Sequence, residues 1–140
     1  MNGRVFLDTN VLIYAASSRG LPAKFARAEE IMAKEDFAIS TQVVGEFVRN
    51  VQSPKKMSPP LSDDEIHHWV NRLFEFPVVT IDREIILDAM VLQRRYRIDF
   101  WDSQIIAAAR RSGAEVLYSE DLSHGQSYGS VRCENPFRDP

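Results

Sequence analysis

Short apolar runs alternate with longer helical patterns along the sequence, and this alternation most narrows the folds open to the chain. The apolar runs fall at residues 4–7, 37–40, 78–81 and 116–118. Between them, apolar residues recur three or four positions apart, which is typical of amphipathic helices. Strands that alternate with helices pair through right-handed crossovers. We therefore predict an α/β fold in which helices cover both faces of a mostly parallel sheet.

Local signals bound several of the expected helices. Thr41 can cap one helix, and Ser62 with Glu65 three positions later forms a capping box at the start of another. Asp82 can cap a third helix. Gly113 suits the left-handed turn that closes the last one.

Size and charge limit the functions open to the chain. Its 140 residues are the usual size of one domain, so we expect residues 1–140 to fold as a single domain. The net charge of -3 argues against a protein that coats nucleic acid, which needs an excess of Lys and Arg. No run approaches the roughly 18 to 20 apolar residues that cross a bilayer. Cys133 is the single cysteine, and no secretion signal is recognisable, so we expect a cytoplasmic protein without membrane contact.

Acidic residues follow the apolar runs where ligands gather in a parallel sheet. Asp8 comes directly after the first run, and Asp121 follows the last. Asp102 begins a helix that runs back from the same edge, and Glu46 lies one turn into its own helix. Since ligands bind outside the carboxyl ends of parallel strands, we expect these acids to share one crevice. Asp99 could itself cap the helix, which would leave Asp102 free for another role.

Each acid also has an ordinary structural explanation. Asp102 could cap a helix, Asp8 and Asp121 could serve turns, and Glu46 could be solvated. Together, however, carboxylates in one crevice raise one another's pKa unless a cation enters. Mg2+ and Mn2+ prefer such oxygen ligands, and no group of His and Cys in the sequence has the spacing of a zinc site. The acids together predict a site for hard divalent cations.

Several segments around these acids carry the pattern of one protein family. They are residues 6–14 with Asp8-Thr9-Asn10, Glu46, residues 100–102 followed by 105–109, residues 119–122 and the tail 135–137. Four acids in this order with these neighbours form a specific motif. Over essentially the whole chain, the sequence resembles PIN-domain ribonucleases, and most closely the VapC-type toxins of prokaryotic toxin-antitoxin pairs.

The resemblance implies a three-layer α/β/α fold with a central, mostly parallel sheet of four or five strands. It also implies that Asp8 and Asp102 bind Mg2+, or Mn2+ in its place, and that Glu46 and Asp121 complete an acidic quartet. Asp99 does not map onto the quartet. The residues expected to support the site are Asn10, Ser119, Thr9 and Asp99.

The activity implied by the resemblance is that of an endoribonuclease. Metal ions would activate water for attack on an RNA phosphodiester bond and offset the charge that develops on phosphorus and the leaving oxygen. A cognate antitoxin and a homodimer are the implied partners. Two other functions stay open. One is an inactive PIN-like module that binds RNA or protein, against which the intact quartet argues. The other is a phosphatase of another acidic α/β fold with Asp8 as nucleophile. Against it, the sequence lacks the second aspartate that is expected two positions after Asp8.

Basic residues provide candidate contacts for RNA. Three arginines surround Tyr96, an aromatic residue that could stack on a base, and two lysines lie in the Pro-rich loop at 53–60. The alternative for the arginines is a solvated helix end, where the helix dipole favours cations. His124, close to Asp121, could touch substrate or have no role in the site. The candidate RNA contacts are Arg94, Arg95, Arg97, Lys55 and Lys56.

Overall fold

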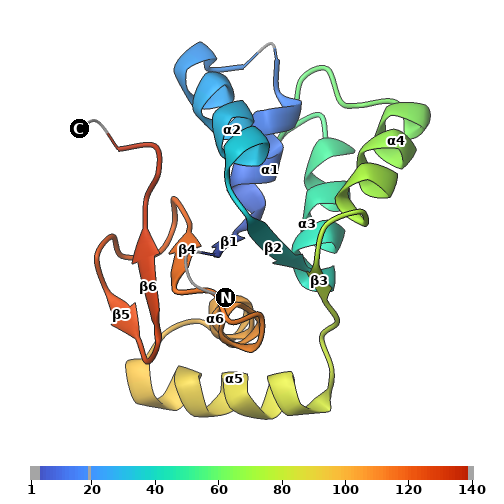
Figure 1. Cartoon of the computed structure of the whole chain (residues 1–140). Coiled ribbons are helices and arrows are strands. Elements are labelled where there is room, and N and C mark those ends of the chain that lie inside the picture. The colour runs from blue at the N-terminus through green and yellow to red at the C-terminus, as the bar shows by residue number, and fades with distance from the viewer. Residues whose placement is uncertain (1–3, 19, 139–140) are drawn as a thin grey trace.

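A computed structural model describes residues 4–18 and 20–138, and its strands form one six-stranded sheet (Figure 1). Neighbouring strands are parallel except at one edge, where β5 and β6 are antiparallel. Helices flank this sheet, so the predicted α/β fold is confirmed. The order across the sheet is β3 (Val78–Val79), β2 (Phe37–Ser40), β1 (Val5–Leu7), β4 (Val116–Tyr118), β6 (Val131–Glu134) and β5 (Ser127–Tyr128).

The described part of the sheet has six strands rather than four or five, because the C-terminal segment adds a hairpin. Its turn contains Gly129 at φ 65°, a conformation that favours glycine. Strand β6 buries Val131 and Cys133 and exposes Arg132 between them. Four residues of alternation are too short a pattern to stand out in a sequence. β3 is shorter than predicted and ends before Ile81.

Six helices lie within the described residues. α5 lies along one side of the molecule and packs against α6, whereas α1 packs against α2 and α3 (Figure 1). None of these helices is long and apolar enough to cross a bilayer. Their bounds are α1 (Thr9–Ala16), α2 (Pro22–Lys34), α3 (Thr41–Val51), α4 (Asp63–Leu73), α5 (Arg83–Tyr96) and α6 (Phe100–Arg111).

Helix starts agree with the predicted caps at α4 and α5 and differ at α3. Ser62 and Glu65 form the predicted capping box, and Asp82 caps α5. The cap of α3 is Ser40 rather than Thr41, so that prediction was wrong. Ser40 ends β2 in the extended conformation that a cap requires, whereas Thr41 is already helical. The Thr41 hydroxyl instead accepts a hydrogen bond from the backbone N–H of Ile81, just beyond the end of β3.

The interior of the molecule is built around β1 and α6. β1 is buried at every position, as expected for a central parallel strand. In α6 every residue from Ser103 to Ala109 is buried, because small side chains let the helix approach both α5 and the sheet closely. Only the two ends of α6 reach solvent.

Candidate functional site

Asp8 lies at the tip of β1, where it caps α1 and is 5% exposed. Its Oδ1 accepts a hydrogen bond from the backbone N–H of Thr9, and its Oδ2 accepts one from the Ser119 hydroxyl, both at 2.7 Å. Burial raises the pKa of Asp8 to about 6, because the two hydrogen bonds offset only part of the desolvation. Glu46 and Asp121 raise it further by repulsion. A cation that reached this carboxylate would therefore stabilise its charged form.

Glu46 projects from α3 and is held by two neighbours. The hydroxyl of Thr9 donates to its Oε1 at 2.6 Å, and the amide of Gln42 donates to its Oε2 at 3.2 Å. The same amide donates to the carbonyl oxygen of Trp101 at 3.1 Å, and Gln42 accepts a hydrogen bond from Gln104 at 2.7 Å. Gln42 therefore ties Glu46 to the first turn of α6. Gln42 was not predicted from the sequence, where its only signal is its place one turn before Glu46.

Asp102 lies in the first turn of α6 and is half-buried. Burial raises its pKa, and repulsion from Asp99, Asp121 and Glu46 adds to the rise. Asp99 is the cap of the helix, so Asp102 is left outside the cap, as the sequence suggested. Glu46 and Asp121 repel both Asp8 and Asp102. The structure therefore brings all four acids, from distant parts of the sequence, into one electrostatic environment.

Asp121 follows β4 and is connected to the tip of β1 through two polar side chains. Asn10 donates from Nδ2 to Asp121 Oδ2 at 3.5 Å and accepts from the backbone N–H of Glu120 at 3.4 Å. Ser119 accepts a hydrogen bond from the backbone N–H of Asp121 at 3.3 Å while it donates to Asp8. The two side chains thus lie between the acids, and Ser119 touches both of them.

The four carboxylates share this edge of the sheet without converging on one point. Across residues 4–18 and 20–138, no three Asp, Glu, His or Cys side chains stand close enough together to hold an ion directly. Electrostatic repulsion acts over longer distances than coordination bonds. The acids can therefore repel one another although they do not stand close enough to bind one ion directly. Their donor atoms are all hard oxygens. This donor set fits Mg2+, which is usually bound through one or two carboxylates and keeps several waters.

A second charged cluster lies beside the acids and was not predicted. Lys24 of α2 forms an ion pair with Glu120, and the hydroxyl of Tyr14 donates to the same carboxylate. Burial alone would raise the pKa of Glu120, but the bonds from Lys24 and Tyr14 hold it below its usual value. The Tyr14 ring also packs edge-on against Phe137, with the ring centroids 4.8 Å apart. This cluster anchors the segment that carries Asp121.

The predicted arginine contacts are exposed, but their aromatic neighbour Tyr96 forms contacts with the C-terminal hairpin. The Tyr96 hydroxyl accepts a hydrogen bond from the backbone N–H of Gly129 at 3.1 Å, and its ring meets Tyr128 edge-on at 5.0 Å. Tyr96 therefore fixes α5 to the β5–β6 hairpin. The exposed arginines at the end of α5, shortly before the first turn of α6, are Arg94, Arg95 and Arg97.

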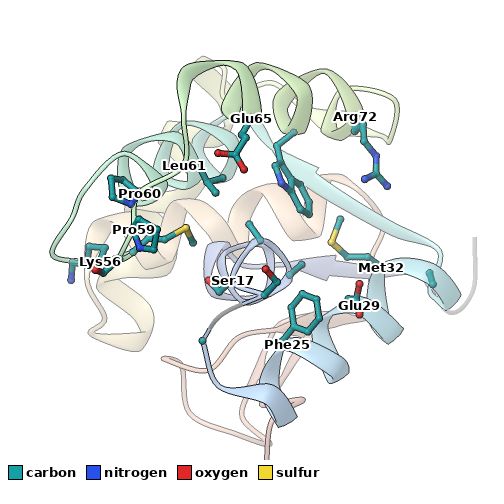
Figure 2. A pocket seen from close by; sticks show the side chains of 18 of the residues that line it. Ser17, Phe25, Glu29, Met32, Lys56, Pro59, Pro60, Leu61, Glu65 and Arg72 are labelled. Atoms are coloured by element: carbon teal, nitrogen blue, oxygen red, sulfur yellow. The ribbon is translucent and has the colours of Figure 1, made fainter.

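The candidate RNA contacts in the Pro-rich loop, Lys55 and Lys56, lie apart from the acids. Lys56 is at the edge of a cavity of about 690 Å³ that none of the four acids lines, and Lys55 precedes it in the same exposed loop. Figure 2 shows Phe25 and Met32 of α2 on one side of this cavity and Leu61 on the other. His124 accepts a hydrogen bond from the backbone N–H of Asn135 at 3.0 Å, and so holds the loop that follows β4.

A central, mostly parallel sheet flanked by helices, with acids at its carboxyl edge, is the fold that was predicted from the sequence. The family model described as PIN domain matches residues 5–126, so the chain belongs to the PIN domain family. The resemblance seen in the sequence is confirmed. No curated protein matches the sequence closely enough to count as a relative.

Several solved structures share this fold. A toxin-antitoxin complex from Klebsiella pneumoniae is 19% identical, with 91% of this chain and 94% of that chain covered and a TM-score of 0.67. VapBC2 from Rickettsia felis, bound to a promoter DNA fragment, is 17% identical over 94% and 97%, with a TM-score of 0.64. VapC20 from Mycobacterium tuberculosis, described as a sarcin-ricin loop cleaving toxin, is 16% identical over 84% and 89%, with a TM-score of 0.62. At these identities the likeness establishes the shared fold.

Proposed function

We propose that this chain is a metal-dependent endoribonuclease that hydrolyses RNA phosphodiester bonds with Mg2+ or Mn2+. The observation that carries the proposal is the environment of Asp8, a buried carboxylate whose pKa is raised to about 6 and which is repelled by Glu46 and Asp121. A divalent cation relieves both the desolvation and the repulsion. One protein of the same fold is described as cleaving the sarcin-ricin loop, which supports RNA as the substrate.

The four acids have distinct roles in this proposal. Asp8 and Asp102 hold the cation, and Glu46 and Asp121 complete the negative site. When bound, the cation activates water and offsets the charge that develops on the phosphate. Asp99 caps α6 and so leaves the carboxylate of Asp102 free to act.

Polar neighbours keep these carboxylates in place. Ser119 and the backbone N–H of Thr9 each bind one oxygen of Asp8, so the carboxylate is fixed in orientation before any ligand arrives. The Thr9 hydroxyl and Gln42 hold Glu46 in the same way. Asn10 restrains Asp121. Fixed donors of this kind favour catalysis because less reorganisation is needed when the charge develops.

Residues 1–140 form one PIN domain in this proposal. The family model accounts for residues 5–126, and the segment beyond it supplies β6 to the sheet and Phe137 to the packing around Tyr14. The cytoplasm is the proposed place of action, which agrees with a single, buried cysteine.

A cognate antitoxin is the proposed regulatory partner. One structure with this fold is a toxin-antitoxin complex, and two VapBC structures with this fold are bound to DNA. By analogy, the chain would be the toxin of such a pair, and its partner would suppress RNA cleavage until it is removed. Copurification of the chain with the product of an adjacent small gene, together with loss of cleavage in the complex, would support this assignment.

A second copy of the chain is the proposed occupant of the outer face of α5. Ile86, Leu87, Met90 and Val91 are 41%, 55%, 49% and 63% exposed, although the opposite face of the helix is buried. A helix that is apolar on both faces is normally covered on both. The stripe is close to symmetric about its midpoint, which suits antiparallel contact across a two-fold axis.

The oligomeric state tests this surface. Leu87→Glu should convert a dimer into a monomer in analytical ultracentrifugation. Phe74→Glu, at a similarly exposed position directly after α4, should leave the dimer unchanged. A wild-type chain that stays monomeric at high concentration would refute the dimer.

RNA cleavage tests the proposed activity. The wild-type chain should cut a mixed RNA sample with Mg2+ or Mn2+, and EDTA or the substitution Asp102→Asn should abolish cutting. Asp64→Asn, which changes an exposed acid of α4, should cut like the wild type. Cleavage that survives both EDTA and Asp102→Asn would exclude the proposal. RNA binding by the wild type without any cutting would instead favour the alternative, a catalytically inactive PIN-like binding module.

A further inference from the structure

Trp101 is a large aromatic side chain that α6 leaves in contact with solvent. It is 58% exposed, whereas residues 103–109 of the same helix are all buried. Its ring contact is with Phe100, edge to face, at a centroid distance of 5.3 Å. An indole that becomes buried removes a large apolar area from water, so an exposed one gains stability when a ligand covers it.

The backbone of Trp101 is tied to the candidate site on both sides of the residue. Its carbonyl oxygen accepts a hydrogen bond from Gln42, and the same amide of Gln42 donates to Glu46. Its N–H donates to Asp99 at 3.0 Å. The next residue in the chain is Asp102. Trp101 therefore precedes Asp102 directly in the chain and is joined through Gln42 to Glu46.

The charges around Trp101 indicate what kind of ligand can cover it. Asp99 is exposed and Asp102 is half-buried, so an apolar protein surface seated on the indole would have to desolvate both carboxylates. A nucleobase presents a flat aromatic face and carries a phosphate that can remain in water or bind a cation. Arg97, four residues before Trp101, is exposed and can receive the backbone of such a strand.

We propose that Trp101 is a stacking platform for an unpaired base next to the cleaved phosphate, and that it makes the chain selective for single-stranded RNA. This inference rests on the proposed ribonuclease function. Stacking on an indole requires a base that can leave its neighbours, which bases in loops and single strands can do and bases in a duplex cannot.

Cleavage kinetics provide the first test. With a single-stranded RNA that the wild type cuts, Trp101→Leu should raise KM by roughly 5- to 150-fold, the factor that corresponds to one lost base stack, and should change kcat much less. Trp101→Phe retains an aromatic face and should recover most of the affinity. Leu21→Ala, which changes another apolar residue with 58% exposure at the start of α2, should behave like the wild type. Binding of the same sequence as a duplex should be equally weak for the wild type and for Trp101→Leu.

Fluorescence provides a test that does not depend on cutting. The chain has two tryptophans, so Trp69→Phe leaves Trp101 as the single indole. Asp8→Asn in the same chain prevents cleavage during the titration. A single-stranded uridine 12-mer should quench the Trp101 emission, whereas the duplex form should not.

The outcomes separate this inference from the proposed activity. If the wild type cuts no RNA, the ribonuclease proposal fails. If it cuts RNA while Trp101→Leu has the wild-type KM and the emission is unaffected by the 12-mer, only the stacking role is refuted. Emission that is blue-shifted in the free protein and moves to the red on dilution would show that a second copy covers Trp101, which also overturns the inference.

Discussion

Two carboxylates near the same edge of the sheet, Glu120 and Asp8, have pKa values shifted in opposite directions. Glu120 pairs with Lys24 and accepts a hydrogen bond from Tyr14, and its pKa lies below the usual value. Asp8 is more deeply buried, and the groups that act on it are a hydroxyl, a backbone N–H and two further acids. Its pKa rises to about 6. The chain thus pairs Glu120 with a cation of its own, Lys24, where that carboxylate anchors the segment after β4. The groups that act on Asp8, at the proposed metal site, include no such cation.

Substitution of Asp8 should have the largest effect and should act on activity and stability in opposite directions. Asp8→Asn should lower kcat/KM for RNA by on the order of 10³-fold or more, because it removes a proposed direct ligand of the cation. In EDTA at pH 8, the variant should be more stable than the wild type by up to roughly 3 kcal/mol, because it removes a buried charge. Chemical denaturation measures this difference.

The pH dependence of that gain follows from the sign of the pKa change. The pKa of Asp8 is higher in the folded chain than its ordinary value of 3.8, so the folded state holds the proton more tightly between about pH 4 and 6. The wild type therefore loses stability as the pH rises through this range, and the loss is complete above it. The advantage of Asp8→Asn should disappear below about pH 4. A variant less stable than the wild type at pH 8 would contradict the electrostatic account.

Activation by Mn2+ should weaken as Asp8 takes up its proton. Below pH 6, the Mn2+ concentration that gives half-maximal cleavage should rise by about tenfold for each pH unit, since proton and cation compete for one carboxylate. Above pH 6, Asp8 should contribute no further change. Cleavage assays at several pH values with Mn2+ titrations measure this. A requirement for Mn2+ that stays constant between pH 5 and 7 would exclude Asp8 as the competing group.

Removal of the Ser119 hydroxyl should widen the difference in pKa between Asp8 and Glu120. Ser119→Ala deletes the hydrogen bond to Asp8 Oδ2, so the pKa of Asp8 should rise and the Mn2+ profile should shift to higher pH. Stability at pH 8 should fall by roughly 1.5–3 kcal/mol, the range for a hydrogen bond to a charged group. Ser123→Ala, at an exposed position in the next loop, is the matched control. An unchanged pH profile would show that Ser119 does not stabilise the charged carboxylate.

Neutralising Glu120 should have the smallest effect. It should lower stability, whereas neutralising Asp8 should raise it. Glu120→Gln removes the ion pair with Lys24 and should lower stability at pH 8 by roughly 0.5–1 kcal/mol, because the pair is partly exposed and screened. The pH at which Mn2+ activation weakens should stay where it is in the wild type. Denaturation at low and high salt measures the contribution of the pair. A gain in stability would mean that Lys24 does not compensate the buried charge.

Local patterns were sufficient to single out the four acids and most of the elements that carry them. Asp8 directly follows a buried strand, Asp121 follows the last predicted strand within three residues, and the competition between Asp99 and Asp102 for the cap was visible from their spacing. The structure places Asp8 at the tip of β1 and Asp121 after β4, with Asp99 as the cap of α6. Such predictions succeed because each depends on residues within a few positions in the chain.

The contacts that the sequence did not reveal join residues far apart in the chain. Gln42 and Trp101 are 59 positions apart, and Tyr14 and Glu120 are 106 apart. No periodic pattern relates such pairs, because their approach depends on how the helices pack. The β5–β6 hairpin was missed for a related reason, since its strands are too short to show an alternation.

The sequence by itself determined the order of the helices and of strands β1 to β4, and the placement of acids after strands, because those features depend on local propensity and hydrophobic spacing. Only the tertiary structure decided which carboxylate has a cation beside it and which does not. That outcome depends on desolvation and on charges brought together from different helices and loops. Asp8 and Glu120 are both acids next to strands, and packing alone places Lys24 beside one of them.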